Sequence, residues 1–183
     1  QAFETSVTGI AQARAIVDAL DDRMLLVLKA DDIERAFREN KFGLIIDFQN
    51  TTAFSDKLER IDMFHNLGLR MCQLSYNIGT LVGEGCTEVH KSGLTYFGRE
   101  VVERLNERRM AVDVSHCSEQ VGWDALDVSS APIIVSHSAS NAVSISGGVY
   151  IGVGESASTL ERPLPSEYGL SGTTGFLSLS WYF

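Results

Sequence analysis

The sequence predicts an α/β fold, a partial (β/α)8 barrel of the TIM type, from three observations. Helical and strand-like segments alternate along the chain from Asp31 onward. The predicted strands are apolar on both parities, as strands that are covered on both faces are. Polar clusters that contain Gln49, Tyr76, His116 or His137 follow these strands. A doubly wound sheet would share the first two features, but the recurrence of polar residues at strand ends favours the barrel, whose active sites lie there.

The composition argues against several classes of protein. The chain has 183 residues, of which 44% are hydrophobic and 21% charged, as expected for one globular unit. A net charge of -9 argues against phosphate-driven binding to nucleic acid and disfavours anionic membrane surfaces. No apolar run approaches the roughly 20 residues of a membrane-spanning helix. Three cysteines without a C-x-x-C pair favour reduced thiols in the cytoplasm, and the start at Gln1 leaves export open.

Boundary signals identify the first elements. The residues before Asp31 look helical, and Asp31 with Glu34 forms a variant of the capping box that starts a helix through Asn40. The run 42–48 is short, apolar and rich in β-branched residues, which predicts a buried strand that ends in the polar residues 49–52.

The middle of the chain continues this alternation. Ser55 is the predicted cap of the next helix, Gly68 its left-handed stop, and 69–74 the following strand. Residues 78–93 are rich in glycine and polar groups and have no periodicity. They predict a long loop, and long loops in compact domains are often functional.

Two further helix-then-strand units follow. Thr95 and Ser118 are the predicted helix caps, and the strands 110–114 and 133–135 end at Ser115-His116 and Ser136-His137. Four such units are therefore visible in the sequence.

His116 and His137 follow successive strands after the similar approaches Val-Asp-Val-Ser-His and Ile-Val-Ser-His. Parallel pairing, with strands about 4.8 Å apart, would place both imidazoles over one point. Neutral imidazole is a common zinc ligand, although a catalytic site needs about three protein ligands and one position for water. The alternative is that each histidine caps its strand or binds a nearby hydroxyl. His65 and His90 have no partner at a strand end, and we expect both at the surface.

Four stretches resemble the membrane (renal) dipeptidase family, peptidase family M19 of the metal-dependent amidohydrolases, in order and spacing from about Asp31 to Val143. They are LGLRMCQLSYN at 67–77, GLTYFGREVV at 93–102, VDVSHCS at 112–118 and APIIVSHS at 131–138.

The resemblance implies an amidohydrolase-like barrel that hydrolyses dipeptides, and sometimes related amides or lactones, by a zinc-activated hydroxide. In this family two zinc ions are bridged by a carboxylate. The matched motifs imply that His116 and His137 hold one zinc, and that Tyr76 and Asn77 orient the dipeptide.

The chain also departs from the family pattern. The H-x-D motif for the other zinc occurs nowhere, and Gln49 stands where the bridging glutamate is expected, in a Phe-Gln-Asn variant similar to a bacterial branch. Gln49 can offer an oxygen to a metal, but a neutral amide cannot neutralise two dications. The family's R-N motif is also missing. We therefore expect a zinc-dependent dipeptide hydrolase with one or two zinc ions, either active or descended from an active one. The alternative is a non-catalytic binding or assembly module on a degenerate half-barrel.

Two regions differ in character: a partial dipeptidase-like barrel over 1–143 and a divergent tail over 144–183 that is rich in glycine and serine. The tail ends in a predicted strand in which Leu177, Leu179, Trp181 and Phe183 alternate. This strand resembles the last strand of outer-membrane barrels, but an ordinary sheet-edge strand is favoured. A complete barrel takes about 250 residues, so we expect a fragment, a degenerate paralogue or half of a homo-oligomer that associates through open sheet edges.

Overall fold

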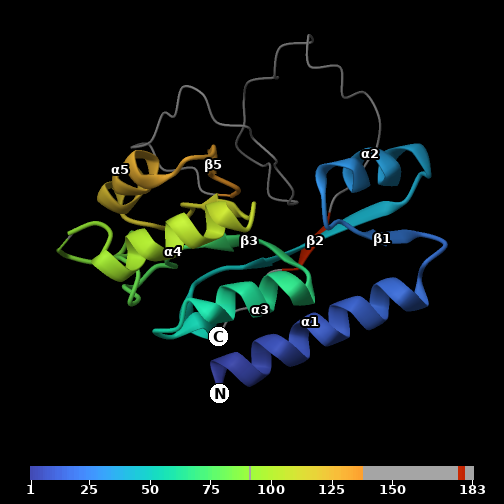
Figure 1. Ribbon diagram of the computed structural model, residues 1–183, viewed down its shortest axis with the longest axis horizontal. Coiled ribbons are helices and arrows are strands. Elements are labelled where there is room, and N and C mark those ends of the chain that lie inside the picture. Colours follow the sequence, from blue (N-terminus) through green and yellow to red (C-terminus); the bar gives the residue numbers. More distant parts are fainter. Residues whose placement is uncertain (91, 138–176, 180–183) are drawn as a thin grey trace, which may run out of the picture.

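A parallel sheet in the order β1-β2-β3-β4-β5 lies at the centre of the computed structural model, which describes residues 1–90 and 92–137 and, for the backbone alone, 177–179 (Figure 1). The strands are β1 (Met24–Leu26), β2 (Phe42–Phe48), β3 (Leu69–Gln73), β4 (Ala111–Asp113), β5 (Ile133–Ile134) and β6 (Leu177–Leu179). The helices are α1 (Ala2–Ala19), α2 (Ala30–Arg38), the 3-10 turn η1 (Thr52–Phe54), α3 (Glu59–Leu67), α4 (Tyr96–Glu107) and α5 (Glu119–Val128).

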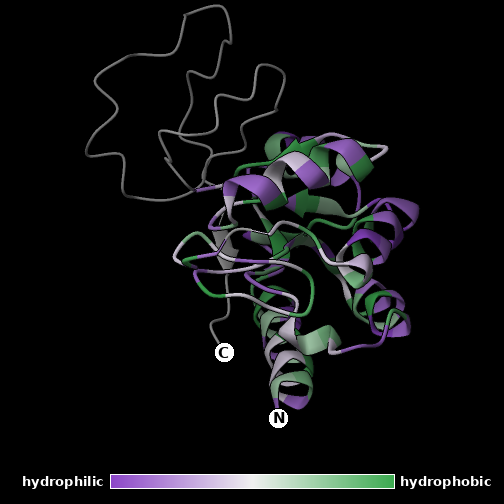
Figure 2. Ribbon diagram, turned by 90° about the vertical axis from the view of Figure 1, so that its left-hand side faces the viewer, coloured by the Kyte–Doolittle hydropathy of each residue, from purple (hydrophilic) through white to green (hydrophobic). Residues whose placement is uncertain are grey.

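Each of the strands β1 to β4 pairs in parallel with the next strand along the chain, and a helix lies in each of these connections. Right-handed crossovers between sequential parallel strands place their helices on the same face of the sheet. The strand order therefore matches part of a (β/α)8 barrel rather than a doubly wound sheet, in which the order reverses. The helices carry hydrophilic residues alongside hydrophobic ones (Figure 2), as elements that pack one face on a sheet do.

Strand β1 is absent from the prediction. The residues before Asp31 were expected to be helical, which holds for α1 but not for Met24–Leu26. Three residues are too few for a period of two to appear in the sequence, and only the pairing with Phe42–Leu44 of β2 makes them a strand.

The start of α2 also differs from the prediction. The helix begins at Ala30 behind Lys29, whereas Asp31 was expected to cap it. The Asp32 carboxylate accepts hydrogen bonds from the backbone N–H groups of Leu28 at 3.0 Å and Lys29 at 3.1 Å. The reciprocal part of the capping box is therefore supplied by Asp32, two residues before the Glu34 that the sequence pattern indicated.

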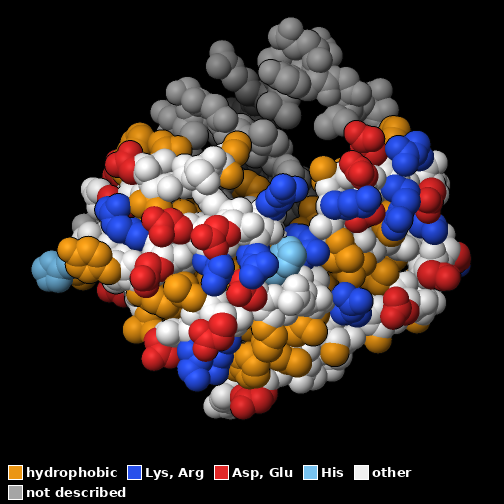
Figure 3. Space-filling model, viewed as in Figure 1, with side chains coloured by type: hydrophobic (Ala, Val, Ile, Leu, Met, Phe, Trp, Pro, Cys, Tyr) orange, Lys and Arg blue, Asp and Glu red, His pale blue; other side chains and the backbone are white. Residues whose placement is uncertain are grey.

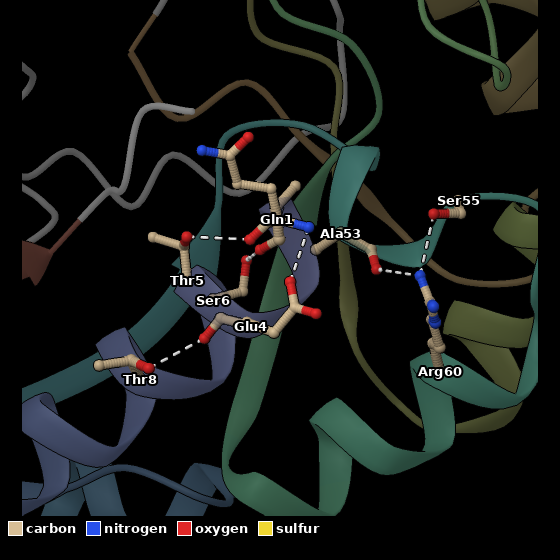
Figure 4. A network of polar contacts seen from close by, with 9 residues as sticks. Gln1, Glu4, Thr5, Ser6, Thr8, Ala53, Ser55 and Arg60 are labelled. Carbon is tan, nitrogen blue, oxygen red and sulfur yellow. Dashed lines mark hydrogen bonds and ion pairs between the residues drawn. The ribbon is translucent and has the colours of Figure 1, made fainter.

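Ser55 does not cap α3. It follows η1 with φ of 53°, in the left-handed region, and α3 begins at Glu59 behind Leu58. The Ser55 hydroxyl instead accepts a hydrogen bond from Arg60 at 2.9 Å, and the same guanidinium donates to the Ala53 carbonyl at 3.2 Å (Figure 4). Arg60 therefore ties the first turn of α3 back to the preceding loop.

The predicted helix stop at Gly68 and the predicted caps Thr95 and Ser118 are confirmed, whereas the strands predicted at 69–74, 110–114 and 133–135 are shorter, at Leu69–Gln73, Ala111–Asp113 and Ile133–Ile134. Gly68 ends α3 with φ of 118°, a conformation that a side chain rarely adopts. Thr95 caps α4 by accepting from the Gly98 N–H at 2.9 Å, and Ser118 caps α5 by accepting from the Val121 N–H at 3.3 Å. Residues 78–93 have no helix or strand within the part that is described.

A cluster of aromatic rings joins the sheet to the helices near α1. The Phe64 ring of α3 lies 4.9 Å from Phe48, 5.6 Å from Phe3 and 5.9 Å from Phe54. The Arg60 guanidinium stacks over Phe3 at 4.4 Å. Phe64 is fully buried, so this cluster fixes α1, η1 and α3 against the end of β2, where the polar residues begin.

The surface carries charged side chains of both signs, as the composition of 15 basic and 24 acidic residues leads one to expect. Acidic and basic side chains are interspersed among the described residues on the face shown in Figure 3. Within the described part of the chain, no helix is long and apolar enough to cross a membrane.

The tail contributes one described strand. Residues 177–179 form β6, which pairs in parallel with Leu44–Ile46 of β2. The predicted boundary after Val143, and the side chains of Trp181 and Phe183, lie outside the described residues.

We predict that Phe64→Ala lowers the free energy of unfolding by about 3–5 kcal/mol, because it opens a cavity among rings that cannot all collapse into it. Chemical denaturation would measure the change. Phe37→Ala is the matched control, since the Phe37 side chain is 64% exposed and its loss should change stability by less than about 0.5 kcal/mol. Equal losses in the two variants would contradict the assignment of this core.

Candidate metal and substrate site

Three rings lie at the same height above the carboxyl ends of β3, β4 and β5. Cys72, Val112 and Ile133 occupy one register row across these strands. The same number of residues along the chain separates each member of this row from a ring: Cys72 from Tyr76, Val112 from His116 and Ile133 from His137. The His116 ring centroid is 4.3 Å from that of Tyr76, with the rings stacked, and 4.8 Å from that of His137. The two histidines predicted to act together are therefore adjacent.

The backbone of His116 contributes to this arrangement. Its φ of 56° lies in the left-handed region, which residues other than glycine adopt infrequently and which is often found at functional sites. The His116 carbonyl accepts from the Cys86 N–H at 2.8 Å, and Gly85 forms an antiparallel bridge with Cys117. These contacts hold the turn that directs the imidazole.

The loop 78–93, predicted to be functional, reaches the site through the same segment. Gly85 packs so closely on the Tyr76 carbonyl and the Asn77 backbone that a Cβ atom at this position would collide with both. The Thr87 N–H donates to the Asn77 carbonyl at 3.0 Å. The loop is thus fastened against the exits of β3 and β4.

Buried polar side chains accompany the strand ends. Asp47, Gln49, Gln73 and Asp113 are each at most 6% exposed. Gln73 and Asp113 are register partners, and Asp47 and Gln49 alternate with Phe48, whose ring packs on Phe64. Because side chains alternate between the faces of a strand, Asp47 and Gln49 lie on the face opposite the aromatic cluster. The Oε1 atoms of Gln49 and Gln73 are buried without a hydrogen-bond partner among the described residues.

Hydrogen bonds engage Nδ1 of each histidine. His116 Nδ1 lies 2.9 Å from Asn77 Oδ1, and His137 Nδ1 lies 2.7 Å from Ser136 Oγ. The Ser136 hydroxyl donates in turn to Asp113 Oδ2 at 2.5 Å. Asp113 and Ser136 were present in the quoted motifs, but the sequence assigned them no role, because a polar residue at or just after the end of a short strand does not reveal its partner.

Electrostatics favour a neutral imidazole at His116. Burial lowers its pKa below the usual value, the neighbouring His137 lowers it further, and Asp113 acts in the opposite sense. Burial also raises the pKa of the Cys72 thiol, and it raises that of Cys117 to about 12, so both thiols stay protonated near neutral pH. The histidines are therefore better metal ligands than the cysteines beside them.

The remaining candidates lie elsewhere. His65 is half-buried rather than at the surface as expected, and burial lowers its pKa, whereas His90 is exposed as expected. Gln49 follows β2, which β3 separates from the strand that leads to His116. No group of three His, Cys, Asp or Glu side chains in the described part of the chain is placed to hold one metal ion.

Comparison with known proteins shows the family to which the chain is similar. The model of the membrane dipeptidase family, peptidase family M19, matches residues 1–147. Dipeptidase tcpJ of Claviceps purpurea is 36% identical over 131 residues, which cover 70% of this chain and 31% of that protein. Dipeptidase 3 of Mus musculus is 33% identical over 124 residues, or 64% of this chain and 24% of the mouse protein.

A solved structure agrees with the sequence matches. An amidohydrolase from Pseudomonas aeruginosa superposes with a TM-score of 0.71 at 30% identity, over 74% of this chain and 41% of that one. The chain therefore spans well under half the length of each of these proteins. The extent of the family match and the shared sheet nevertheless lead to one conclusion: the chain belongs to the membrane dipeptidase family, M19.

Proposed function

We propose that this chain supplies the His116–His137 part of the zinc site of a dipeptidase-type hydrolase. The observation that carries the proposal is the distance of 4.8 Å between the two ring centroids at the ends of adjacent strands. Family membership supports it, because M19 proteins are metallopeptidases and both relatives described above are named dipeptidases.

The two imidazoles fit a shared metal. A Zn–N bond of about 2.0–2.1 Å with a tetrahedral angle separates two coordinated ring centroids by roughly 5 Å. The distance in this chain agrees, and the lowered pKa of His116 keeps its nitrogen available as a ligand at neutral pH. Zinc bound there would lower the pKa of a water molecule and polarise the scissile carbonyl. Gln49 offers a buried amide oxygen as a weaker ligand for a second ion.

Tyr76 and Asn77 form the side of the site next to β3. The Tyr76 ring stacks on His116, which places an aromatic surface beside the proposed metal position. Such a surface can cover the apolar part of a bound dipeptide or related small amide and exclude water from it. We propose Tyr76 as the substrate contact on this side of the site.

A second candidate function is metal-dependent binding or assembly without hydrolysis. It is favoured by the absence of H-x-D from the sequence and of a third acidic, cysteine or histidine ligand beside the pair in the described residues. The edges at β1 and β5, which pair with no further strand among the described residues, would then serve association with a second copy.

We predict that His116→Ala and His137→Ala each weaken Zn²⁺ binding by more than about 100-fold, because each removes a coordinating nitrogen. Mutation of a residue that only hydrogen-bonds to a metal ligand typically costs roughly 10–100-fold. Competition with a chromophoric chelator would measure the affinity. His90→Ala is the control, since His90 is exposed in the loop. Unchanged affinity in the two site variants would exclude this metal site.

The hydrolase and the binding module differ in turnover. If the first proposal holds, the purified chain loaded with Zn²⁺ should cleave unblocked dipeptides, lose the activity in chelator and regain it when zinc is restored. Amine release would be followed with a fluorogenic reagent. Zinc binding without turnover by the chain would favour the second candidate.

Gln49→Glu should increase the amount of zinc bound, because a carboxylate replaces a neutral amide and supplies the charge that a second dication needs. Gln49→Met, of similar size, should leave only the ion held by the histidines. Metal analysis after dialysis would compare the two variants with the unchanged chain. Equal zinc content in all three would show that position 49 is not a ligand.

A further inference from the structure

We propose that Asn77 and Asp113, the latter acting through Ser136, hold His116 and His137 in the tautomer with the proton on Nδ1 before any metal binds. The three are positioning residues, because they act on the proposed ligands and not on the substrate. The purpose of the device rests on the proposed metal site, whereas the tautomers themselves can be observed without metal.

The direction of the hydrogen bond at His137 follows from the single proton of a serine hydroxyl. Ser136 Oγ donates that proton to Asp113 Oδ2. The same oxygen lies 2.7 Å from His137 Nδ1, where it can then only accept. His137 must therefore carry its proton on Nδ1, and Nε2 is its acceptor nitrogen.

Asp113 is fixed as the end of this chain of hydrogen bonds. Its side chain is 1% exposed. Oδ1 accepts from the Ser115 N–H at 2.9 Å, the Ser115 hydroxyl at 2.7 Å and the Ser136 N–H at 3.3 Å. Two backbone donors therefore orient the carboxylate so that Oδ2 faces the Ser136 hydroxyl.

His116 is held by a different group with the same outcome. Asn77 Oδ1 has no proton to give, so the 2.9 Å contact requires His116 Nδ1 to be the donor. The Cys86 thiol donates to the same oxygen at 3.6 Å. This contact gives Asn77 a role distinct from the substrate contact expected of it.

Both histidines thus have Nε2 as the acceptor, which is the state that a metal bound through both Nε2 atoms requires. Histidine ligands in proteins commonly donate their other N–H to an oxygen, which sets the tautomer and the ring orientation. The two arrangements differ in charge, since His116 donates to a neutral amide while His137 is linked to a carboxylate. They can therefore be disturbed separately.

Asp113→Asn provides that separation. The two backbone N–H groups at Oδ1 require the oxygen of the substituted amide to stay on that side, so its NH2 group must face Ser136 Oγ. Ser136 would then accept from this NH2 group and donate to His137, which reverses the hydrogen bond and moves the His137 proton to Nε2. His116, held by Asn77, is an internal control in the same sample.

Long-range proton–nitrogen NMR spectra of the metal-free, nitrogen-15-labelled full chain at about pH 8, above the ordinary histidine pKa, distinguish the tautomers. We expect Nδ1–H for both histidines in the unchanged chain, and a switch of His137 alone in Asp113→Asn. Asn77→Ala should remove the hydrogen bond that fixes the tautomer of His116 and leave His137 unaffected. Asn77→Asp, which keeps an acceptor oxygen at this position, should preserve the Nδ1–H tautomer of His116. Nε2–H in the unchanged chain, or a His137 signal unmoved by Asp113→Asn, would overturn the proposal.

Zinc affinity gives a second readout. Asp113→Asn should weaken Zn²⁺ binding by about 10–100-fold, and Ser136→Ala, which removes the relay without adding a donor, covers the case in which the asparagine variant does not fold. An unchanged chain that shows the expected tautomers but binds no zinc would count against the proposed function alone. Zinc binding that both folded variants retain at full strength would count against the positioning role alone.

Discussion

The shared register of β3, β4 and β5 is the constraint on which the site depends. In neighbouring parallel strands, residues that lie the same number of positions after aligned strand residues end up at the same level beyond the carboxyl edge of the sheet. Tyr76, His116 and His137 meet this condition, and their rings form one row with centroids 4.3 Å and 4.8 Å apart. The helices support the sheet from the outside, as where Phe64 of α3 packs on Phe48 at the end of β2.

The sheet and the histidine pair could be predicted because their signals are local. The predicted strands are short, mainly apolar runs, and Gly68, Thr95 and Ser118 act within one turn of their own helix. The elements that prediction missed depend on distant partners or on side-chain direction. Strand β1 exists only through its pairing with β2, and the start of α2 depends on which of two neighbouring aspartates turns back to the N-terminal backbone.

The candidate site shows the same division. The spacing of His116 and His137 could be read from the strand ends, but the left-handed backbone of His116 could not, because it is imposed by contacts with the loop around Cys86. The role of Asp113 could not be read from the sequence either, since Ser136, the partner that links it to His137, lies 23 residues later on another strand exit. Long-range hydrogen bonds set the orientation of rings whose approximate position the sequence already indicates.

Strand β5 is joined to β4 by only two paired residues. A slip of one residue would turn every side chain of a strand to the opposite face, and here it would exchange Ser136 with His137 in front of Asp113. The Asp113 carboxylate receives both the backbone N–H and the hydroxyl of Ser136, and it can do so in a single alignment of the two strands. These hydrogen bonds therefore form only when β5 is correctly aligned with β4, so a misplaced strand would also displace His137, the proposed metal ligand.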